Sequence, residues 1–277
     1  MKNRKLLVAI AQAKIEPWEN IWKFGQFPTW VDRYRSEFCI VNVSGLPMGR
    51  FLTKVDQIHE RQRYRRCVGK WQGRLDYLFV PWLNRNIPEW NELNTKDIHE
   101  IRIETVASYL FAGRRLIGTL NWFVKETDYE FIFLTTTSSF LNLGLLSKKI
   151  EQFNPSEYVY MGQVLGDKPK QFVSGAGQLL SRATAELVLR NFKKFPQEML
   201  NDAALGSLLR ELNIKPTDHP WLWLRSEKEV KDLRLEDVRD VFHFRTKTFE
   251  PQRKDATIMR SLHECLVKMN LEGDVYY

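Results

Sequence analysis

The sequence predicts an α/β fold in which a mostly parallel sheet is flanked by helices. Short apolar runs at residues 5–11, 37–43 and 131–134 are typical of strands that are buried on both faces of a sheet. Residues 106–123 and 256–269 instead repeat apolar side chains at helical spacing. No stretch rich in Pro, Gly or Ser divides the 277 residues, so we expect a single domain that spans the whole chain.

The other elements follow from the same two patterns. The first strand, KLLVAIA, delivers Gln12 at its carboxyl end, where a nucleotide-binding sheet contacts the base or ribose. The aromatic cluster at 16–30 is more typical of packing than of a sugar platform. Strands are expected at 5–11, 37–43, 75–80, 100–104, 131–134, 158–162 and 241–245, and helices at 106–123, 141–151, 183–191, 202–212 and 256–269.

Residues 131–142, FIFLTTTSSFLN, are central to the predicted sheet. The apolar run ends at Leu134, and three threonines and two serines follow it. In open α/β sheets ligands lie beyond the carboxyl ends of the strands, which places a hydroxyl-rich run at a ligand-facing edge: Thr135, Thr136, Thr137, Ser138 and Ser139. The alternative is a turn whose hydroxyl groups cap the following helix, and this stretch taken alone favours the turn.

Two further segments carry candidate site residues. Gly175-Ala176-Gly177 combines glycines that permit close backbone approach to a ligand. Asn201-Asp202 begins a predicted helix, where a carboxylate is either a catalytic group or a helix cap.

The charge balance suits an anionic partner. Lys and Arg number 42 against 34 acidic residues, which gives a net charge of +8. The most basic stretch, 59–74, is interleaved with Tyr64 and Trp71, a composition found in nucleic-acid-binding helices. A solvated helix face is the more common explanation, and the sequence contains no helix-turn-helix, RNP or zinc motif. We therefore expect no nucleic-acid partner, with such binding kept as an alternative.

The cysteine pattern and the apolar segments bear on location. Cys39, Cys67 and Cys265 are isolated and show no CxxC spacing, which fits a reducing compartment. No run reaches transmembrane length. The first residues resemble a short signal peptide, but its removal would delete the first predicted strand. We expect a cytoplasmic protein, with peripheral membrane contact as an open alternative.

Taken in order, several segments between residues 100 and 270 resemble glycosyltransferase family 31, the fringe and β-1,3-galactosyltransferase group. The resemblance rests on order and spacing more than on identity. The residues that carry it are Tyr109, Arg115 and Trp122 in a helix; Thr136, Thr137 and Ser138 before Asn142; Gly175, Gly177 and Ser181; Asn201, Asp202 and Gly206; and a late His243.

The resemblance implies a GT-A-like single domain over 1–277, with a nucleotide-sugar-binding half at about 1–140 and an acceptor-binding half at about 141–277. It implies inverting transfer of a sugar from a nucleotide-diphosphate donor, with UDP-sugars expected. The acceptor would be a hydroxyl of a glycan or lipid-linked glycan in surface polysaccharide synthesis. Asp202 would be the general base, and Gly175, Ala176 and Gly177 would contact the donor or acceptor sugar. The alternative is a catalytically inactive relative that binds sugar nucleotides or glycans.

The chain departs from the family where a metal would bind. Thr136, Thr137 and Ser138 replace the acids that hold a divalent cation, and hydroxyl groups are poor ligands for hard cations. We therefore expect no metal site and no required cofactor; a Mn or Mg ion recruited by the donor phosphates is the alternative. Basic side chains would then neutralise the leaving diphosphate. The donor-binding candidates are Gln12, Arg115, Thr136, Thr137, Ser138, His243, Arg245 and Lys247, with Arg253 and Lys254 as further cations.

Overall fold

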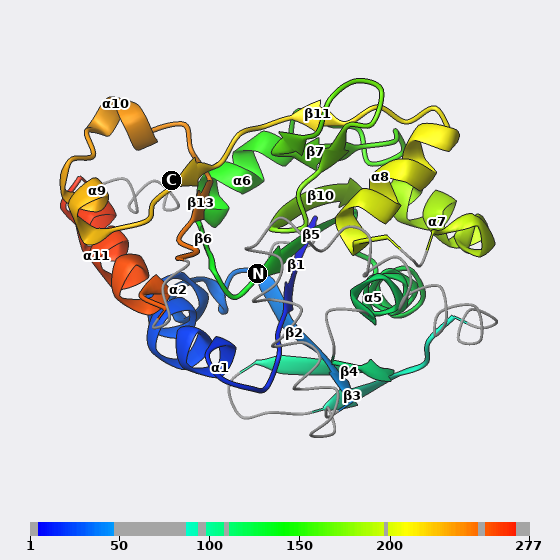
Figure 1. The fold of residues 1–277 in the computed structure, drawn as a ribbon, viewed down its shortest axis with the longest axis horizontal. Coiled ribbons are helices and arrows are strands. Elements are labelled where there is room, and N and C mark those ends of the chain that lie inside the picture. Colours follow the sequence, from blue (N-terminus) through cyan, green and yellow to red (C-terminus); the bar gives the residue numbers. More distant parts are fainter. Residues whose placement is uncertain are drawn as a thin grey trace, which may run out of the picture.

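The computed structural model describes residues 5–46, 87–93, 98–107, 111–196, 199–248 and 253–269. The strand predicted at 75–80, the basic stretch at 59–74 and Tyr109 lie outside these ranges. In the described part of the chain, an eight-stranded sheet has the order β11-β7-β10-β5-β1-β2-β4-β3 and is flanked by helices (Figure 1). The predicted α/β class is therefore confirmed.

The large sheet takes its strands from the whole length of the described chain up to residue 218. The strands are β1 Leu6–Ala11, β2 Cys39–Leu46, β3 Trp90–Leu93, β4 His99–Val106, β5 Phe131–Thr136, β7 Tyr160–Gly162, β10 Gly177–Ser181 and β11 Thr217–Asp218. A small sheet, in the order β12-β13-β6, contains β6 Ser139–Leu141, β12 Leu222–Trp223 and β13 His243–Arg245, and a hairpin pairs β8 Val164–Leu165 with β9 Phe172–Val173.

Most helices pack on one of the two faces of the large sheet. The helices are α1 Trp18–Ile21, the π-helix η1 Trp22–Val31, α2 Asp32–Tyr34, α5 Ala112–Glu126, α6 Leu143–Ile150, α7 Arg182–Arg190, the 3-10 helix η3 Phe192–Lys194, α8 Asn201–Glu211, α9 Glu227–Lys231, α10 Leu235–Val238 and α11 Asp255–Lys268.

Strand direction places the carboxyl ends of the central strands at one edge. β1 pairs in parallel with β2 and β5, β2 pairs in parallel with β4, and β7 with β11. β3 and β10 run antiparallel to their neighbours. Because β10 runs backwards, its first residue, Gly177, lies opposite Thr135 near the end of β5. The expectation of a mostly parallel sheet is confirmed, and the edge where β1 and β5 end also receives the start of β10.

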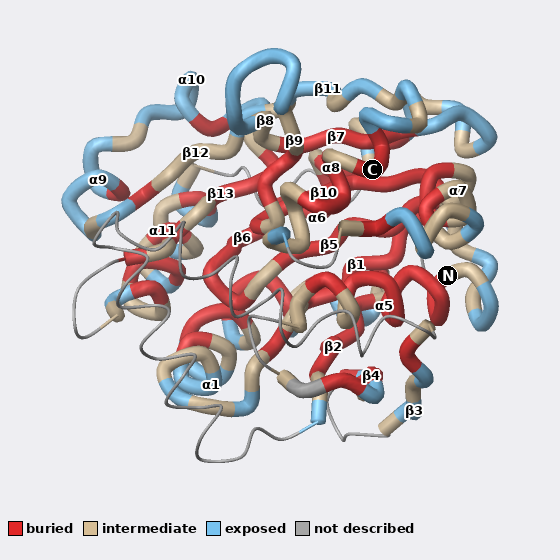
Figure 2. Tube along the Cα trace, turned by 45° about the vertical axis from the view of Figure 1, so that its right-hand side comes forward, coloured by how far each residue is buried: buried red, intermediate tan, exposed pale blue. Residues whose placement is uncertain are grey.

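The core has one layer on each face of the sheet. Along β1, Leu6, Val8 and Ile10 point to one cluster, and Leu7 and Ala9 point to the other. The first cluster packs against η1, α6 and α11, and the second against α5, α7 and α8 (Figure 1). The central strands are therefore buried on both sides, whereas α9 and α10 are largely exposed (Figure 2). Continuous apolar runs are what such strands require.

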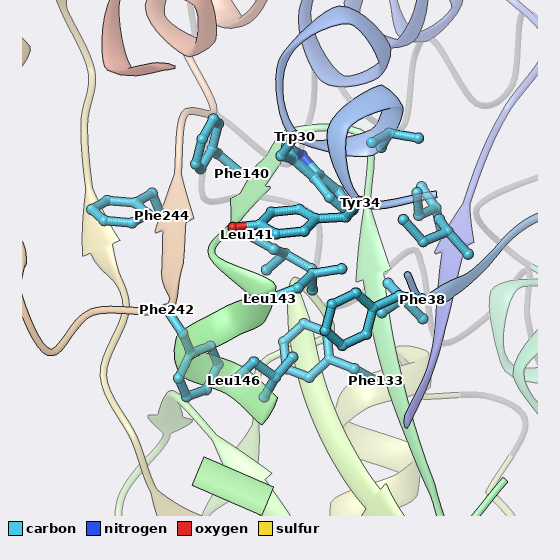
Figure 3. Packing of buried hydrophobic residues seen from close by; sticks show 14 of the residues in the cluster. Trp30, Tyr34, Phe38, Phe133, Phe140, Leu141, Leu143, Leu146, Phe242 and Phe244 are labelled. Atoms are coloured by element: carbon cyan, nitrogen blue, oxygen red, sulfur yellow. The ribbon is translucent and has the colours of Figure 1, made fainter. Parts of the chain in front are cut away.

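Aromatic side chains join the small sheet to the first cluster. Phe133 of β5 packs edge-on against Phe242 before β13, and Phe140 of β6 packs edge-on against Phe244 of β13. Trp30 of η1 completes this layer (Figure 3). The aromatic-rich segment at 16–30 accordingly serves packing, as the sequence indicated, through a π-helix that the periodicity did not reveal.

Two of the predicted helices begin later than expected. The helix expected from residue 106 begins at Ala112, because β4 extends to Val106 as an inner strand of the sheet. The helix expected from residue 141 begins at Leu143, because Ser139–Leu141 form β6 against β13. The cap of that helix is Asn142, whose Oδ1 accepts from Leu145 N at 3.1 Å, so the Thr and Ser hydroxyl groups are not its caps.

Among the described residues, no helix is both long enough and apolar enough to cross a membrane.

Candidate functional site

The turn between β5 and β6 lies at the carboxyl edge of the sheet and is held from below by η1. Gln26 Nε2 donates to the carbonyl oxygens of Thr136 at 3.1 Å and Ser139 at 3.0 Å, which span the turn. Trp30 Nε1 also donates to Ser139 O, at 3.0 Å. Gln26, Trp30 and Ser139 are fully buried, and Thr136 is partly exposed. The backbone of the turn is therefore fixed independently of any ligand.

Two arginine side chains reach the hydroxyl groups of this turn. Antiparallel pairing of β13 with β6 sets Arg245 opposite Ser139. Arg245 Nη1 donates to Thr136 Oγ1 at 2.7 Å and to Ser139 Oγ at 3.3 Å. Arg253 Nη2 donates to Ser138 Oγ at 2.7 Å. Two of the three hydroxyl groups that stand in place of acids, those of Thr136 and Ser138, therefore accept from guanidinium groups.

Arg253 has a second partner that changes its electrostatic role. It forms an ion pair with Asp255, a fully buried residue at the start of α11. Burial alone would raise the pKa of Asp255, but the hydrogen bonds and charge of Arg253, with smaller help from Ser138 and Thr248, lower it below its usual value. Arg253 is thus compensated by a carboxylate and serves to anchor Ser138.

His243 is neutral and buried beside Arg245. Burial, with the charge of Arg245 and the proximity of His219, lowers the pKa of His243 to about 3. Its Nε2 lies 3.1 Å from Ser139 Oγ. The single Ser139 hydroxyl proton is directed at Ala176 O, 3.2 Å away, so we assign the His243 proton to Nε2, which donates to Ser139.

Gly175-Ala176-Gly177, the glycine segment, completes the site. Ala176 O accepts from Thr135 Oγ1 at 2.8 Å as well as from Ser139. Gly175 N donates to Asp202 Oδ2 at 3.0 Å, which joins the segment to the first turn of α8. A Cβ at position 177 would lie 2.4 Å from His243 Cε1, so only glycine fits there.

Asp202 has its other oxygen engaged within α8. Ala203 N donates to Asp202 Oδ1 at 2.9 Å, while the N-cap residue of the helix, Leu200, makes no side-chain cap. The carboxylate therefore serves both the helix start and the glycine segment, and it is half-buried rather than closed off.

The structure brings most of the predicted site residues together. Direct contacts connect Thr136, Ser138, His243, Arg245, Gly175, Ala176, Gly177 and Asp202 through Ser139 and the strand pairs described above.

The other candidates lie around this group. Gln12 follows Ala11, which is paired with Thr136, and Gln12 N donates to Val43 O. Thr137 is buried in the turn, and its Oγ1 has no hydrogen-bond partner within the described residues. Lys247 follows β13, and its carbonyl accepts from Trp223. Arg115 is set apart, because α5 packs on the opposite face of the sheet from β13.

The sequence did not reveal the roles of the groups that organise the site. Ser139 lies in the same hydroxyl-rich run, but nothing in the run distinguishes it from Ser138. Gln26 lies 110 residues before Thr136 in the chain, and no local pattern relates the two. The only signal in the sequence for the role of Asp255 is Arg253, two residues earlier, with which it pairs.

The residues at this edge do not suit a divalent cation. Thr136 and Ser138 offer neutral oxygens that already accept from guanidinium groups, whose charge repels a metal ion. No group of three or more His, Cys, Asp or Glu residues suited to a metal occurs in the part of the chain that is described.

The sequence matches no family model, and no curated protein matches it. Among solved structures, a crystal structure of a glycosyltransferase involved in the glycosylation of the major capsid of PBCV-1 shares 9% identity with a TM-score of 0.40. The match covers 94% of this chain and 99% of that chain. Similarity at this level does not by itself assign a function.

The Arg253–Asp255 pair predicts a defined pH dependence of stability. Because the folded-state pKa of Asp255 is lowered, its contribution is present above the unfolded pKa of about 4 and is lost as the pH falls through the folded value. Asp255→Asn leaves Arg253 buried without its charge partner and should reduce the free energy of unfolding by about 3 kcal/mol at neutral pH. Urea unfolding at a series of pH values should show this difference shrinking below about pH 4.

Asp240→Asn is the matched control, because Asp240 pairs with Arg239 on the surface and is 87% exposed. It should change neither the stability nor its pH dependence measurably. A pH-independent deficit in Asp255→Asn would contradict the assignment.

Proposed function

We propose that the chain is a glycosyltransferase that moves a sugar from a nucleotide-diphosphate donor to a hydroxyl group. The observation that carries this proposal is a single junction at the carboxyl edge of the sheet. There a cation-bearing strand, a hydroxyl-rich turn, a glycine segment and a helix-borne carboxylate meet. This is the arrangement that the resemblance to family 31 implies, with a GT-A-like fold, although the metal motif is replaced.

The donor diphosphate would bind between the turn and β13. Arg245 already lies against Thr136 and Ser139, so its guanidinium is oriented before any ligand arrives. Arginine offers paired N–H donors that match phosphate oxygens, and preorganised charge stabilises a leaving diphosphate. Further contacts would come from Thr136, Thr137, Ser138 and Lys247, and Gln12 would face the nucleoside. Arg115 lies on α5 at the other face of the sheet, so this group does not support its role.

The acceptor would bind beside Asp202. As general base, its carboxylate removes the proton of the attacking hydroxyl, on the face of the sugar opposite the leaving diphosphate, which inverts the anomeric centre. The Gly175-Ala176-Gly177 backbone would contact the sugars, since the lack of side chains at both glycines permits close approach.

The expected partners follow from this chemistry. The donor would be a UDP-sugar and the acceptor a glycan or lipid-linked glycan of a surface polysaccharide. We propose a cytoplasmic enzyme of hexosyltransferase type, with peripheral membrane contact when the acceptor is lipid-linked. An inactive sugar-nucleotide-binding relative is the second candidate, favoured by the backbone hydrogen bonds that engage both oxygens of Asp202.

Arg245→Ala should weaken UDP binding. Loss of a charge-assisted hydrogen bond costs roughly 1.5–3 kcal/mol, or about 10- to 150-fold in Kd. Isothermal titration with UDP measures this directly. Arg239→Ala is the control. It removes an exposed cation four residues before β13, and the variant should bind UDP normally. Equal losses in both variants would indicate diffuse electrostatics instead of a site.

Asp202→Asn should abolish transfer while UDP binding survives. The amide oxygen can still accept from Gly175 N, so the glycine segment keeps its anchor, but the base is lost. We expect a decrease in turnover of roughly a hundredfold or more. Transfer from UDP-sugars, assayed alongside UDP affinity, tests this. Near-normal turnover in a folded Asp202→Asn protein would exclude Asp202 as the base.

Activity should persist without a divalent cation. Two guanidinium groups already occupy the hydroxyl groups where the family's acids would hold the metal. The measurement is UDP-sugar transfer or hydrolysis after exhaustive chelation, before and after Mn or Mg is added back. Activity that disappears with chelator and returns with metal would contradict this prediction, and no activity in either condition would favour the inactive relative.

A further inference from the structure

A cluster of aromatic rings adjoins the glycine segment. Residues 219–221 connect β11, at the edge of the large sheet, to β12 of the small sheet. The His219 ring stacks on Phe242, with centroids 4.2 Å apart and planes 4° from parallel. The Trp221 ring meets His243 edge-on at 5.5 Å. Phe133 contacts both Phe242 and His243 edge-on, so these five rings form one cluster, the ring cluster.

Two members of the ring cluster differ from the other three. Phe133, Phe242 and His243 are buried, whereas His219 and Trp221 are only half-buried. Within the described residues, the Trp221 indole N–H donates to no group, and it is not among the polar atoms closed off from solvent. His219 Nε2 is enclosed and has no hydrogen-bond partner in the same part of the chain. The Trp221 N–H is therefore open to a hydrogen bond with solvent or a ligand, whereas the His219 nitrogen is a buried polar atom left unpaired among the described residues.

We propose that Trp221 and His219 form a platform for a pyranose ring of the acceptor. This inference rests on the proposed transferase function, because only a transferase has an acceptor. A pyranose has a face of C–H groups and a rim of hydroxyl groups. A half-exposed indole matches both, because its ring packs on the C–H face and its N–H reaches a hydroxyl. Burial and the charge of Lys149 lower the pKa of His219, so its ring is neutral and can pack against C–H groups.

Strand register favours the acceptor over the donor diphosphate. β12 pairs with β13 so that Trp223 lies opposite Arg245. Trp221 precedes β12 and therefore lies toward the other end of β13, beside His243. His243 in turn abuts Gly177, and Gly175 two residues earlier binds Asp202. Trp221 is thus connected through direct contacts to the proposed base, and it lies two residues before Trp223, the residue of β12 that is opposite Arg245.

Indole NMR tests the platform without requiring turnover. In protein labelled with ¹⁵N-tryptophan, Trp221→Phe identifies the Trp221 signal among nine tryptophans. The probes are the methyl β-D-glucopyranoside, galactopyranoside and mannopyranoside, titrated into the UDP-bound protein. We expect at least one to shift the Trp221 signal.

Trp90 is the matched control. It too is half-buried and meets another ring edge-on, Trp122 at 6.2 Å, but it lies on β3 at the opposite end of the sheet. Its signal should not move. If none of the three glycosides shifts Trp221, or if they shift Trp90 equally, the platform is excluded.

A kinetic measurement separates acceptor from donor. With the responding methyl glycoside as acceptor, Trp221→Ala should raise its KM roughly tenfold, as expected for one lost aromatic contact, and leave UDP affinity unchanged. Trp221→Phe, which keeps the ring face, should lose less. Weakened UDP binding with an unchanged acceptor KM would overturn the assignment to the acceptor. If UDP does not bind but a glycoside still shifts Trp221, the transferase proposal fails and the sugar platform stands.

Discussion

The site depends on the three hydrogen bonds of the Ser139 hydroxyl group. It is fully buried and accepts from His243 and Arg245 while it donates to Ala176 O. One oxygen therefore links the strand that bears the cation to the glycine segment that binds Asp202. Because a hydroxyl has one proton and two lone pairs, these three bonds satisfy it completely. A satisfied buried network of this kind fixes geometry, since every alternative arrangement leaves a polar atom unpaired.

The nearby arginines explain why hydroxyl groups can replace acids at this turn. A carboxylate at position 136 or 138 would neutralise Arg245 or Arg253 by direct pairing, as Asp255 neutralises Arg253. Neutral hydroxyl groups instead orient Arg245 and bring no opposite charge of their own. The same reasoning explains the neutrality of His243, since a second charge in this buried space would face both desolvation and Arg245.

The large sheet could be predicted from the sequence, because its central strands are buried on both faces and must be continuous apolar runs. Gly175 and Asp202 stand next to predicted element ends, whereas His243 was indicated by the resemblance to family 31 and Arg245 by the need for a cation. Their partners could not be found. β6 and β12 are too short to show a period, and they exist because β13 pairs with them. Gln26 acts from a π-helix, whose spacing of side chains differs from the helical pattern that a sequence search assumes.

The small sheet explains why distant segments converge on this edge. β6 follows β5 after a two-residue turn, and β13 pairs with β6 more than 100 residues later in the chain. β12 then adds to β13 and carries Trp221 to the side of His243. The pairing of three short strands thus places the cation, the neutral imidazole and the half-exposed indole in order along one border. On the proposal made here, that order runs from the diphosphate to the acceptor, with the sugar transferred between them.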